Sequence, residues 1–483
     1  MELGKRPRVL IFVVAYNAER TIQEVIRRVP ASLGDYDTEI LIIDDSSRDQ
    51  TFERAHDLEK AGECPYPITI LYNPVNQGYG GNQKIGFHYA IEQGFDVVAL
   101  VHGDGQYAPE RLPDLLDPLI RGEADAVFGS RMMTRFGALQ GGMPLYKYAG
   151  NRILTTFQNW LLGSNLSEFH SGYRLYSVEA LKRVPFERNT NDFHFDTEII
   201  IQLFLAGQRV KELPIPTFYG DEICHVNGLK YAWDIVKTTL LSKVQRLGIL
   251  YDRKFEVERL DAAVPSKLDF ESPEKLALAR IPSGARVAVI GSGNAPLRRA
   301  LEERGCRVTS IDLNQDSEFP ARADGFDYIL LLDVIEHLRA PERFLDSLRE
   351  SMRAPGELTI IASTGNVGFV VTRFALLMGW FNYGRRGILD LTHTRLFTLT
   401  SFRKLFEQCG FRVEEIRAAP APFPLAFGDG ALAKFALAIN RGLIRISRRL
   451  FGYQVFLVCR PLPTLASLLS SARETRQQKI ASR

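Results

Sequence analysis

The chain is poor in cysteine, and this excludes two kinds of covalent or metal staple. Its 483 residues include five cysteines, which lie far apart and form no Cys-x-x-Cys pair. An odd number of scattered thiols favours neither a disulfide framework nor a structural zinc site. We therefore expect ordinary hydrophobic cores and residence in a reducing compartment, the cytoplasm.

Long apolar runs and a large net charge are also missing. No uninterrupted apolar stretch reaches the roughly 18 residues that a membrane-spanning helix needs. The opening MELGKRPRVLIFVV resembles a signal peptide, but its apolar run is short and lacks a small-residue cleavage site, so we interpret it as a buried strand. A net charge of +3 is too small to indicate a nucleic-acid partner.

Basic residues are unevenly distributed along the chain. Residues 441–483 contain nine Lys and Arg residues against a single acid, Glu474. Within 368–386 and 433–453, apolar residues are interrupted by arginines, as in basic amphipathic helices. Such helices suit the surface of an anionic bilayer at the inner face of a membrane, or they cover the edge of a sheet.

The first half of the chain alternates short apolar runs with segments of helical spacing. This alternation predicts an α/β fold with a mainly parallel sheet covered on both faces. The segments 19–29 and 80–92 have the helical spacing. The predicted strands are 8–14, 38–44, 67–73, 95–102 and 124–130.

Polar clusters follow the first four of these strands. They are Tyr16-Asn17, Asp44-Asp45, Asn76-Gln77-Gly78 and His102-Gly-Asp104. Parallel sheets bind ligands at the carboxyl ends of their strands, so the clusters predict a site. Asp104 could supply a carboxylate, and Gln106 an amide oxygen, to Mg²⁺ or Mn²⁺ on a nucleotide diphosphate. The alternatives are a plain turn at Asp104 and an Asx turn at Asp44-Asp45.

Several segments of the first half resemble glycosyltransferase family 2, especially its branch similar to dolichol-phosphate mannose synthase. The matching segments are VVAYNAERTI (13–22), IIDDSSRDQT (42–51), NQGYGGNQKIG (76–86), HGDGQYAPE (102–110), GSR (129–131), SEFHSGYRLY (167–176) and FDTEIIIQLFLAGQRVKELPI (195–215). The resemblance implies a GT-A fold, a nucleotide-sugar donor, a lipid-phosphate or glycan acceptor and inversion at the anomeric carbon.

The resemblance also implies roles for individual residues. Nucleoside contacts fall to Tyr16, Asn17 and Asp45, metal contacts to Asp104 and Gln106, and phosphate contacts to Arg131, Arg152 and Arg174. The first aspartate of the family's metal motif is replaced by His102, whose imidazole ligates Mn²⁺ better than Mg²⁺. The alternative for His102 is a hydrogen bond to a neighbouring strand.

Glu168 is the candidate catalytic base for the transfer. It stands where the family usually has an aspartate, and an inverting transfer needs a base or an acceptor that is already ionised. An anionic lipid phosphate needs no strong base, and Glu168 would then only orient Arg174. Glu198 is a third candidate, although its apolar neighbours favour a role in fixing a loop.

A second α/β domain is predicted after a linker. Residues 251–280 are polar and rich in proline, with one short helix near 273–280. The strand–turn segment RVAVIGSG (286–293) is followed by an expected helix over 295–304, and Asp312 lies 21 positions after the first glycine. A further strand and helix are expected within 326–345. The arrangement is typical of a nucleotide-binding sheet.

This second part resembles class I S-adenosylmethionine-dependent methyltransferases across about 281–415, with Glu336-His337 as a landmark of the family. The family acid two residues before the first glycine is Val289 here, and few residues separate Asp312 from Asp327. This shortening favours, as an alternative, a degenerate domain without activity. The expected cofactor-binding residues are Gly291, Gly293, Asp312 and Asp333.

The segment 390–411 resembles methyltransferases that act on sugars or glycolipids, and its Asp390 and His393 form a candidate acceptor-side pair. His393 would accept a hydroxyl proton; a buried structural histidine is the alternative. We predict a glycosyltransferase domain (1–250), a linker (251–280), a methyltransferase-like domain (281–462) and a mobile tail (463–483).

Taken as a whole, the sequence predicts an enzyme that transfers a sugar and methylates a glycan or glycolipid. The alternative is a glycosyltransferase whose C-terminal half docks it to a membrane or a partner. Nucleic acid is not expected as a partner, because basic residues do not interleave with aromatics along one face.

Overall fold

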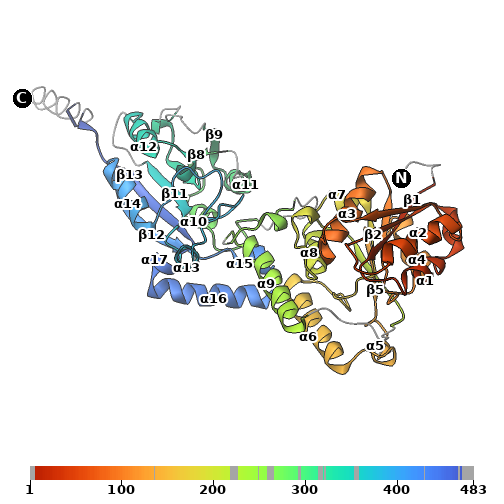
Figure 1. Cartoon of the computed structure of the whole chain (residues 1–483). Coiled ribbons are helices and arrows are strands. Elements are labelled where there is room, and N and C mark those ends of the chain that lie inside the picture. The colour runs from red at the N-terminus through yellow and green to blue at the C-terminus, as the bar shows by residue number, and fades with distance from the viewer. Residues whose placement is uncertain are drawn as a thin grey trace, which may run out of the picture. The chain divides into compact units, whose positions relative to one another are not determined.

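A computed structural model describes residues 6–134, 136–217, 227–248, 250–257, 266–291, 295–313, 319, 323–352, 358–428, 430–465 and 468–469. The chain forms two compact units, residues 1–243 with 252–262 and residues 244–251 with 263–483. Each unit contains its own sheet (Figure 1). The predicted architecture of two successive α/β domains is therefore confirmed.

The first unit is built on a seven-stranded sheet in the order β3-β2-β1-β4-β6-β5-β7. Its strands are β1 (Arg8–Ala15), β2 (Asp37–Asp44), β3 (Ile68–Tyr72), β4 (Val97–His102), β5 (Ala126–Ser130), β6 (Arg174–Ser177) and β7 (Val210–Pro214). Strand β6 is antiparallel to β4 and β5, and the other pairs are parallel. All five predicted strands are present.

Helices cover both faces of this sheet because its central strands are apolar on both sides (Figure 1). In β1, Val9, Ile11 and Val13 pack into the core with α1, α2 and α4, whereas Leu10 and Phe12 pack into the core with α3 and α8. The helices are α1 (Ile22–Arg27), α2 (Thr51–Ala61), α3 (Tyr79–Glu92), α4 (Leu112–Ile120), α5 (Gly137–Gln140), α6 (Leu145–Leu162), α7 (Val178–Lys182), α8 (Phe195–Leu205) and α9 (Gly228–Arg246).

The second unit is built on a six-stranded sheet in the order β12-β13-β11-β10-β8-β9. Its strands are β8 (Arg286–Ile290), β9 (Arg307–Ile311), β10 (Tyr328–Leu332), β11 (Thr359–Gly365), β12 (Phe411–Ala419) and β13 (Gln454–Pro461). Only β13 runs antiparallel to its neighbours, β11 and β12. Within the described residues β9 lies at one edge of the sheet, next to β8, in keeping with the short interval between Asp312 and Asp327.

The helices of the second unit also pack on both faces of their sheet. The predicted helices near 273–280 and 295–304 are both present. The helices are α10 (Pro273–Arg280), α11 (Ala295–Glu303), α12 (Pro341–Glu350), α13 (Val370–Leu377), α14 (Leu399–Gln408), α15 (Phe423–Phe427), α16 (Ala431–Ile446) and α17 (Arg448–Phe451).

Among the residues that the structure describes, no helix is both long and apolar enough to cross a membrane. Gly293 and most of the predicted tail lie outside the described residues.

Candidate functional site

The polar clusters predicted after β1, β2 and β4 meet at one edge of the first sheet. The backbone amide of Asp45 donates to Ala15 O at 2.9 Å, and that of Gly103 donates to Val14 O at 2.9 Å. Asn17 adopts a left-handed conformation (φ 51°) and accepts a hydrogen bond from the Arg48 amide through its side chain. The ends of three neighbouring strands are thus tied into one surface.

The two aspartates after β2 have different surroundings. The carboxylate of Asp45 accepts hydrogen bonds from the Asn73 side chain at 2.7 Å and from the amides of Gln77 and Gly78 at 2.8 and 3.0 Å. It fixes the loop that leads into α3. Asp44 accepts from the Ser47 amide, as the Asx-turn reading expects, but the helix begins later, at Thr51.

Asp44 belongs to a predicted cluster, but the sequence predicted the nucleoside contact for its neighbour Asp45. Its Oδ2 is buried and has no hydrogen-bond partner among the described residues. Burial raises the pKa of this carboxyl group above its ordinary value. An orphaned acceptor at this edge can take a hydrogen bond from a bound ligand, because buried polar groups are rarely left unpaired. Tyr16, 45% exposed, lies at the same edge.

The turn after β4 presents a carboxylate to solvent. Asp104 is exposed, and the hydrogen bond found to its carboxylate in the described chain comes from the Gln106 amide at 3.0 Å. His102 is instead enclosed by Tyr79 and Tyr107, with ring centroids 5.7 and 5.0 Å away. Burial lowers the pKa of His102, so its imidazole is neutral at pH 7 and can act as a ligand.

Glu168 forms a buried salt bridge with Arg131. Arg131 donates from its backbone amide to Oε2 at 2.8 Å and from Nε to Oε1 at 3.0 Å, and Asn151 of α6 donates to Oε1 at 2.8 Å. Burial disfavours the charged carboxylate, but the charge and hydrogen bonds of Arg131, with the bond from Asn151, hold the pKa of Glu168 below its ordinary value. Glu168 is therefore ionised, and both of its carboxylate oxygens already accept hydrogen bonds from Arg131 and Asn151.

The expectation that Glu168 would orient Arg174 is wrong, since its partner is Arg131. Arg174 is 1% exposed and faces Asp196, with Nη1 3.3 Å from Oδ1. Its Nε donates to Ser171 O at 2.7 Å and its Nη2 to Phe169 O at 2.7 Å. These bonds hold the 169–171 loop. Arg131 directly follows β5, whereas Arg174 begins β6 after the 169–171 loop. The two arginines therefore come from different strands and bond different partners.

Arg152, the third arginine predicted to contact phosphate, is exposed to solvent. Arg152 lies on the exposed face of α6, one residue after the buried Asn151. Glu198 is buried and accepts from the Thr190 amide at 2.6 Å and from Lys254 at 2.7 Å, so it fixes a loop as expected.

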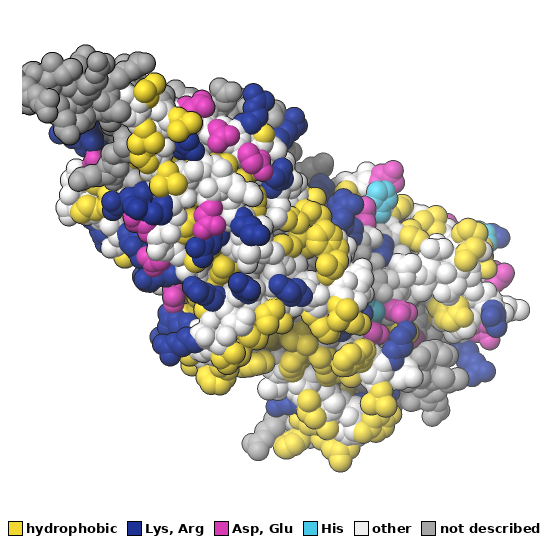
Figure 2. Space-filling view, turned by 90° about the vertical axis from the view of Figure 1, so that its left-hand side faces the viewer, with side chains coloured by type: hydrophobic (Ala, Val, Ile, Leu, Met, Phe, Trp, Pro, Cys, Tyr) yellow, Lys and Arg dark blue, Asp and Glu magenta, His cyan; other side chains and the backbone are white. Residues whose placement is uncertain are grey.

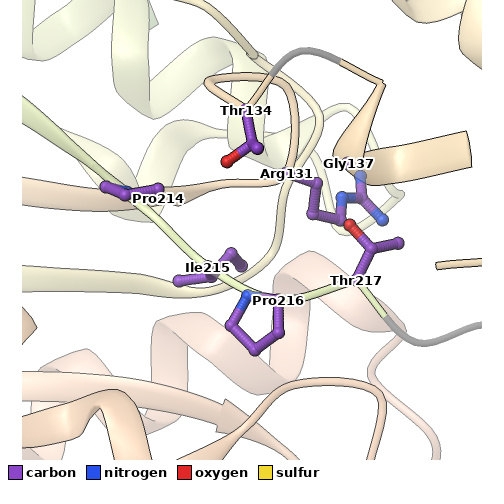
Figure 3. Close-up of a pocket in the computed structure, with 7 residues that line it drawn as sticks. All are labelled: Arg131, Thr134, Gly137, Pro214, Ile215, Pro216 and Thr217. Carbon is purple, nitrogen blue, oxygen red and sulfur yellow. The ribbon is translucent and has the colours of Figure 1, made fainter. Parts of the chain in front are cut away.

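Arg131 also lines a cavity of about 250 Å³. Figure 3 shows the loop of Arg131 and Thr134 on one side of this cavity and the segment 214–217 on the other. The lining combines a cation and two hydroxyl side chains with Pro214, Ile215 and Pro216. Such a mixture fits a molecule with an anionic head and an apolar remainder.

His170 and Tyr231 are further site residues that sequence reasoning missed. The Nδ1 of His170 lies 3.1 Å from the Tyr231 hydroxyl of α9, and its Nε2 is buried without a partner in the described structure. Burial, with the charges of Arg174 and Arg131, lowers the pKa of His170 to about 4. The sequence predicted roles for the nearby Glu168 and Arg174 but none for His170. No local sequence pattern indicates that Tyr231 reaches this site.

The second unit places its predicted residues at the carboxyl ends of β8, β9 and β10. Gly291 has a φ of 88°, a conformation that favours glycine, and an added Cβ would meet Val334 Cγ2 at 3.8 Å, an ordinary van der Waals contact. Asp312 is exposed at the end of β9. Asp333 is already engaged: Lys267 lies 3.1 Å from its Oδ2, and Gln454 and Ser363 donate to it.

His393 lies beside His337, with ring centroids 4.9 Å apart. Its Nδ1 faces Ile388 O at 3.0 Å, which leaves Nε2 as the proton acceptor, and burial lowers its pKa. The Asp390 carboxylate does not pair with the His393 ring. It accepts from the Thr392 hydroxyl at 2.7 Å, and that hydroxyl lies 3.1 Å from His337 Nδ1.

Two family models match the chain. The model for glycosyl transferase family 2 matches residues 10–184, and a methyltransferase domain model matches residues 260–416.

Several relatives of the first part are named as glycosyltransferases of lipid phosphates. The undecaprenyl-phosphate mannosyltransferase of Micrococcus luteus is 28% identical over 45% of this chain and 85% of its own length. The polyprenol monophosphomannose synthase of Mycolicibacterium smegmatis is 27% identical over 45% of this chain and 79% of its own. The UDP-N-acetylglucosamine–dolichyl-phosphate N-acetylglucosaminyltransferase of Methanococcus voltae is 27% identical over 44% and 86%.

Among solved structures, glucosyl-3-phosphoglycerate synthase from Mycobacterium tuberculosis in complex with Mn²⁺, UDP and phosphoglyceric acid aligns with a TM-score of 0.38. The identity is 18%, over 54% of this chain and 81% of that one. Residues 10–184 form a glycosyl transferase family 2 domain of the dolichol-phosphate mannose synthase type, and residues 260–416 form a domain of the methyltransferase family.

Proposed function

We propose that the first unit transfers a sugar, with inversion, from a nucleotide-sugar donor to a lipid phosphate. The observation that carries this proposal is the cavity beside Arg131, whose cationic and apolar lining suits an isoprenoid-type phosphate. Arg131, which lines the cavity, is hydrogen-bonded to Glu168. The relatives named for undecaprenyl phosphate, dolichyl phosphate and polyprenol monophosphomannose support the same acceptor class.

The salt bridge between Glu168 and Arg131 is compatible with a lipid-phosphate acceptor, because this acceptor needs no catalytic base. A lipid phosphate is already anionic, so its oxygen can attack the anomeric carbon while the bond to the donor diphosphate breaks, and no proton needs to be removed. Arg131, held in place by Glu168, would face the acceptor phosphate. Glu168 is then a positioning residue.

The donor would bind at the carboxyl ends of β1, β2 and β4. Asn17, Tyr16 and the unpaired oxygen of Asp44 would contact the nucleoside, and Asp45 would fix the neighbouring loop that leads into α3. A divalent ion would bind the exposed carboxylate of Asp104 together with the donor diphosphate, and the side-chain oxygen of Gln106 and the imidazole of His102 are the further candidate donors. The described residues contain no group of three or more His, Cys, Asp or Glu side chains that could hold a metal ion, so the diphosphate would supply part of the ligand set. The ion would neutralise charge on the leaving diphosphate.

The test is an assay of nucleotide sugars with a polyprenyl phosphate. Asp104→Ala should abolish transfer and remove the metal dependence of donor binding, measured by titration calorimetry with and without Mn²⁺. The matched control is Asp114→Ala, an acid of α4 outside this edge. Full wild-type activity in excess chelator would contradict the metal proposal. His102→Asp should move the preference toward Mg²⁺.

A glycan hydroxyl is the second candidate acceptor, and His170 is the observation that favours it. A hydroxyl must lose its proton, and the neutral His170 offers a buried Nε2 without a partner in the described residues. His170→Gln would then lower turnover about 10²-fold or more. Near-normal turnover with a polyprenyl phosphate favours the lipid-phosphate acceptor.

We also propose that the second unit binds S-adenosylmethionine and methylates a glycan or glycolipid. The left-handed turn at Gly291, the exposed Asp312 and His393, whose Nδ1 is held by Ile388 O, support this activity. The cofactor would supply the methyl group, and His393 would take the acceptor hydroxyl proton. The engagement of Asp333 by Lys267 favours the alternative, a degenerate domain that docks the enzyme.

Calorimetric titration of S-adenosylmethionine into the full chain separates these alternatives. Asp312→Ala should weaken binding about 10- to 150-fold if its carboxylate grips the ribose. Asp346→Ala on α12 serves as the control. The absence of saturable heat with the wild type would favour the docking role.

A further inference from the structure

Helix α16 of the second unit has an apolar sector that faces solvent. Ala433 and Asn440 lie on its buried side, and Asn440 accepts from the Ala421 amide at 2.9 Å and donates to Phe451 O at 3.0 Å. These bonds fix the rotation of the helix, so the opposite sector cannot turn inward. The outward apolar residues, between 37% and 78% exposed, are Leu432, Phe435, Ile439 and Ile446.

Helix α13 and the residues after it expose a second apolar group. Thr372 and Ala375 are buried, and Arg373 donates to Gly368 O at 2.7 Å, which anchors the start of the helix. The residues that remain exposed, between 40% and 80%, are Phe374, Leu376, Leu377, Met378, Trp380 and Phe381. Such a run of large apolar side chains is unusual on a surface that meets only water.

The two groups belong to one region of the unit. Phe423 of α15 packs in the small core of Phe369 and Val370 at the start of α13, and α15 also contacts α16. We call these ten exposed residues of α13, 378–381 and α16 the apolar face.

Basic side chains border the apolar face, and acids are absent from its sequence. Lys434 and Arg445 lie on one flank of α16, with Arg448 and Arg449 at its end, and all four are exposed. Neither 358–389 nor 430–473 contains an aspartate or glutamate. Figure 2 shows Lys and Arg side chains next to gathered hydrophobic side chains on this side of the molecule.

Exposed apolar side chains bordered by basic ones fit some binding partners of the apolar face better than others. A second copy of the chain would place the same basic residues opposite each other in a symmetric interface, without acids to neutralise them. An anionic bilayer accepts the apolar side chains below its headgroups and attracts the Lys and Arg side chains to its phosphates.

We propose that the apolar face of the second unit binds the surface of an anionic lipid bilayer. The binding requires neither the sugar donor nor the acceptor, so it goes beyond the proposed transfer and can fail or hold independently of it.

The test measures co-sedimentation of the full chain with vesicles of phosphatidylcholine alone or mixed with phosphatidylglycerol, without nucleotide sugar or polyprenyl phosphate. Binding should require phosphatidylglycerol and fall steeply when salt is raised, because screening weakens the attraction of basic residues. Phe374→Ser with Phe435→Ser, and separately Lys434→Glu with Arg445→Glu, should each weaken partitioning at least about 10-fold.

Two controls match these variants. Tyr72→Ser removes a half-exposed apolar side chain of β3, and Arg299→Glu with Lys404→Glu makes the same charge change on α11 and α14. Both should leave partitioning within about twofold of the wild type. All the substituted residues are exposed, so unchanged thermal unfolding is expected and verifies folding.

Partitioning that is equal in the apolar-face variants and their controls would overturn the proposal. So would a concentration-dependent dimer, seen by sedimentation velocity, that only the apolar-face variants abolish while vesicles do not bind. Transfer to a detergent-dispersed polyprenyl phosphate is measured in parallel. Its loss in the wild type, with vesicle binding intact, would count against the proposed function and leave the membrane surface standing.

Discussion

At the scale of single residues, pairing inside the protein separates the residues that can meet a ligand from those that brace the site. Asp45, Glu168 and Arg174 have their polar atoms bonded to protein groups, whereas Asp104 is exposed and Asp44 keeps an orphaned oxygen. Residue types and order predicted which segments form the site. They could not predict this division, because it depends on partners such as Asn73, Asn151 and Asp196, which lie elsewhere in the sequence.

Glu168→Gln tests the bracing role. Removing this charge leaves the Arg131 guanidinium buried without its counter-ion, which should cost about 3–5 kcal/mol of unfolding free energy. Urea unfolding at pH 7 measures the loss, and Glu179→Gln, an exposed acid of α7, is the control. A variant that keeps wild-type stability but loses turnover about 10²-fold would instead identify Glu168 as the base.

Glu336 gives the second unit a defined pH dependence. Burial and the charge of Asp333 raise the pKa of Glu336 to about 8, so the folded state keeps a proton that the unfolded state releases above about 4.5. Its contribution to stability is full below pH 4.5 and is lost as pH rises toward 8. Glu336→Gln, which resembles the protonated acid, should therefore gain stability relative to the wild type between pH 5 and 8.

Thermal unfolding of both proteins across this pH range checks the prediction. A constant difference between them at pH 5 and pH 8 would contradict the raised pKa. The other titrating groups are common to the two proteins, so the difference reports on Glu336 together with its charged neighbour Asp333.

At the scale of elements, continuous apolar runs made the strands of the first sheet predictable. Strand β1 is buried on both faces, so its sequence RVLIFVVA carries a clear signal. The antiparallel β6 was not predicted, because four residues, RLYS, carry too short a pattern. The α9 helix supplies Tyr231 to the site, but the polar pattern around it gave no sign of this.

Arg174 bonds two carbonyl groups of the loop 169–171, and this gives an element-scale prediction. Arg174→Lys keeps the charge, but a single ammonium cannot replace the planar fork that bonds Ser171 O, Phe169 O and Asp196 O. We expect a loss of about 3 kcal/mol in unfolding free energy and a large loss of transfer. Urea unfolding measures the stability.

Arg152→Lys is the matched control, because Arg152 lies on the exposed face of α6. Its stability should stay within about 0.5 kcal/mol of the wild type. A stable Arg174→Lys variant with weakened donor binding would show that Arg174 contacts phosphate directly.

At the scale of the whole molecule, the two compact units each place their own candidate site at the carboxyl ends of their own strands. The sequence predicted this repetition because both halves show the strand, turn and helix order of nucleotide-binding sheets. It left the relation between the two activities open.

Separate sites predict separable defects. Asp312→Ala should weaken S-adenosylmethionine binding and leave sugar transfer unchanged, and Asp104→Ala should do the reverse. Transfer rates and calorimetric titrations of the same protein samples measure both. Loss of both activities in a folded variant would indicate that the two reactions share an acceptor channel.

Gly172 sits so close to the His102 imidazole that a Cβ atom there would lie 2.5 Å from its Cε1 and 2.6 Å from its Nε2. In a library that varies every codon, position 172 should therefore tolerate only synonymous changes as long as the histidine is present. Shortening residue 102 to alanine should relax that requirement and admit alanine or serine at 172. We therefore expect residues 102 and 172 to vary together in functional variants: a side chain larger than glycine at 172 should occur only with a small residue at 102.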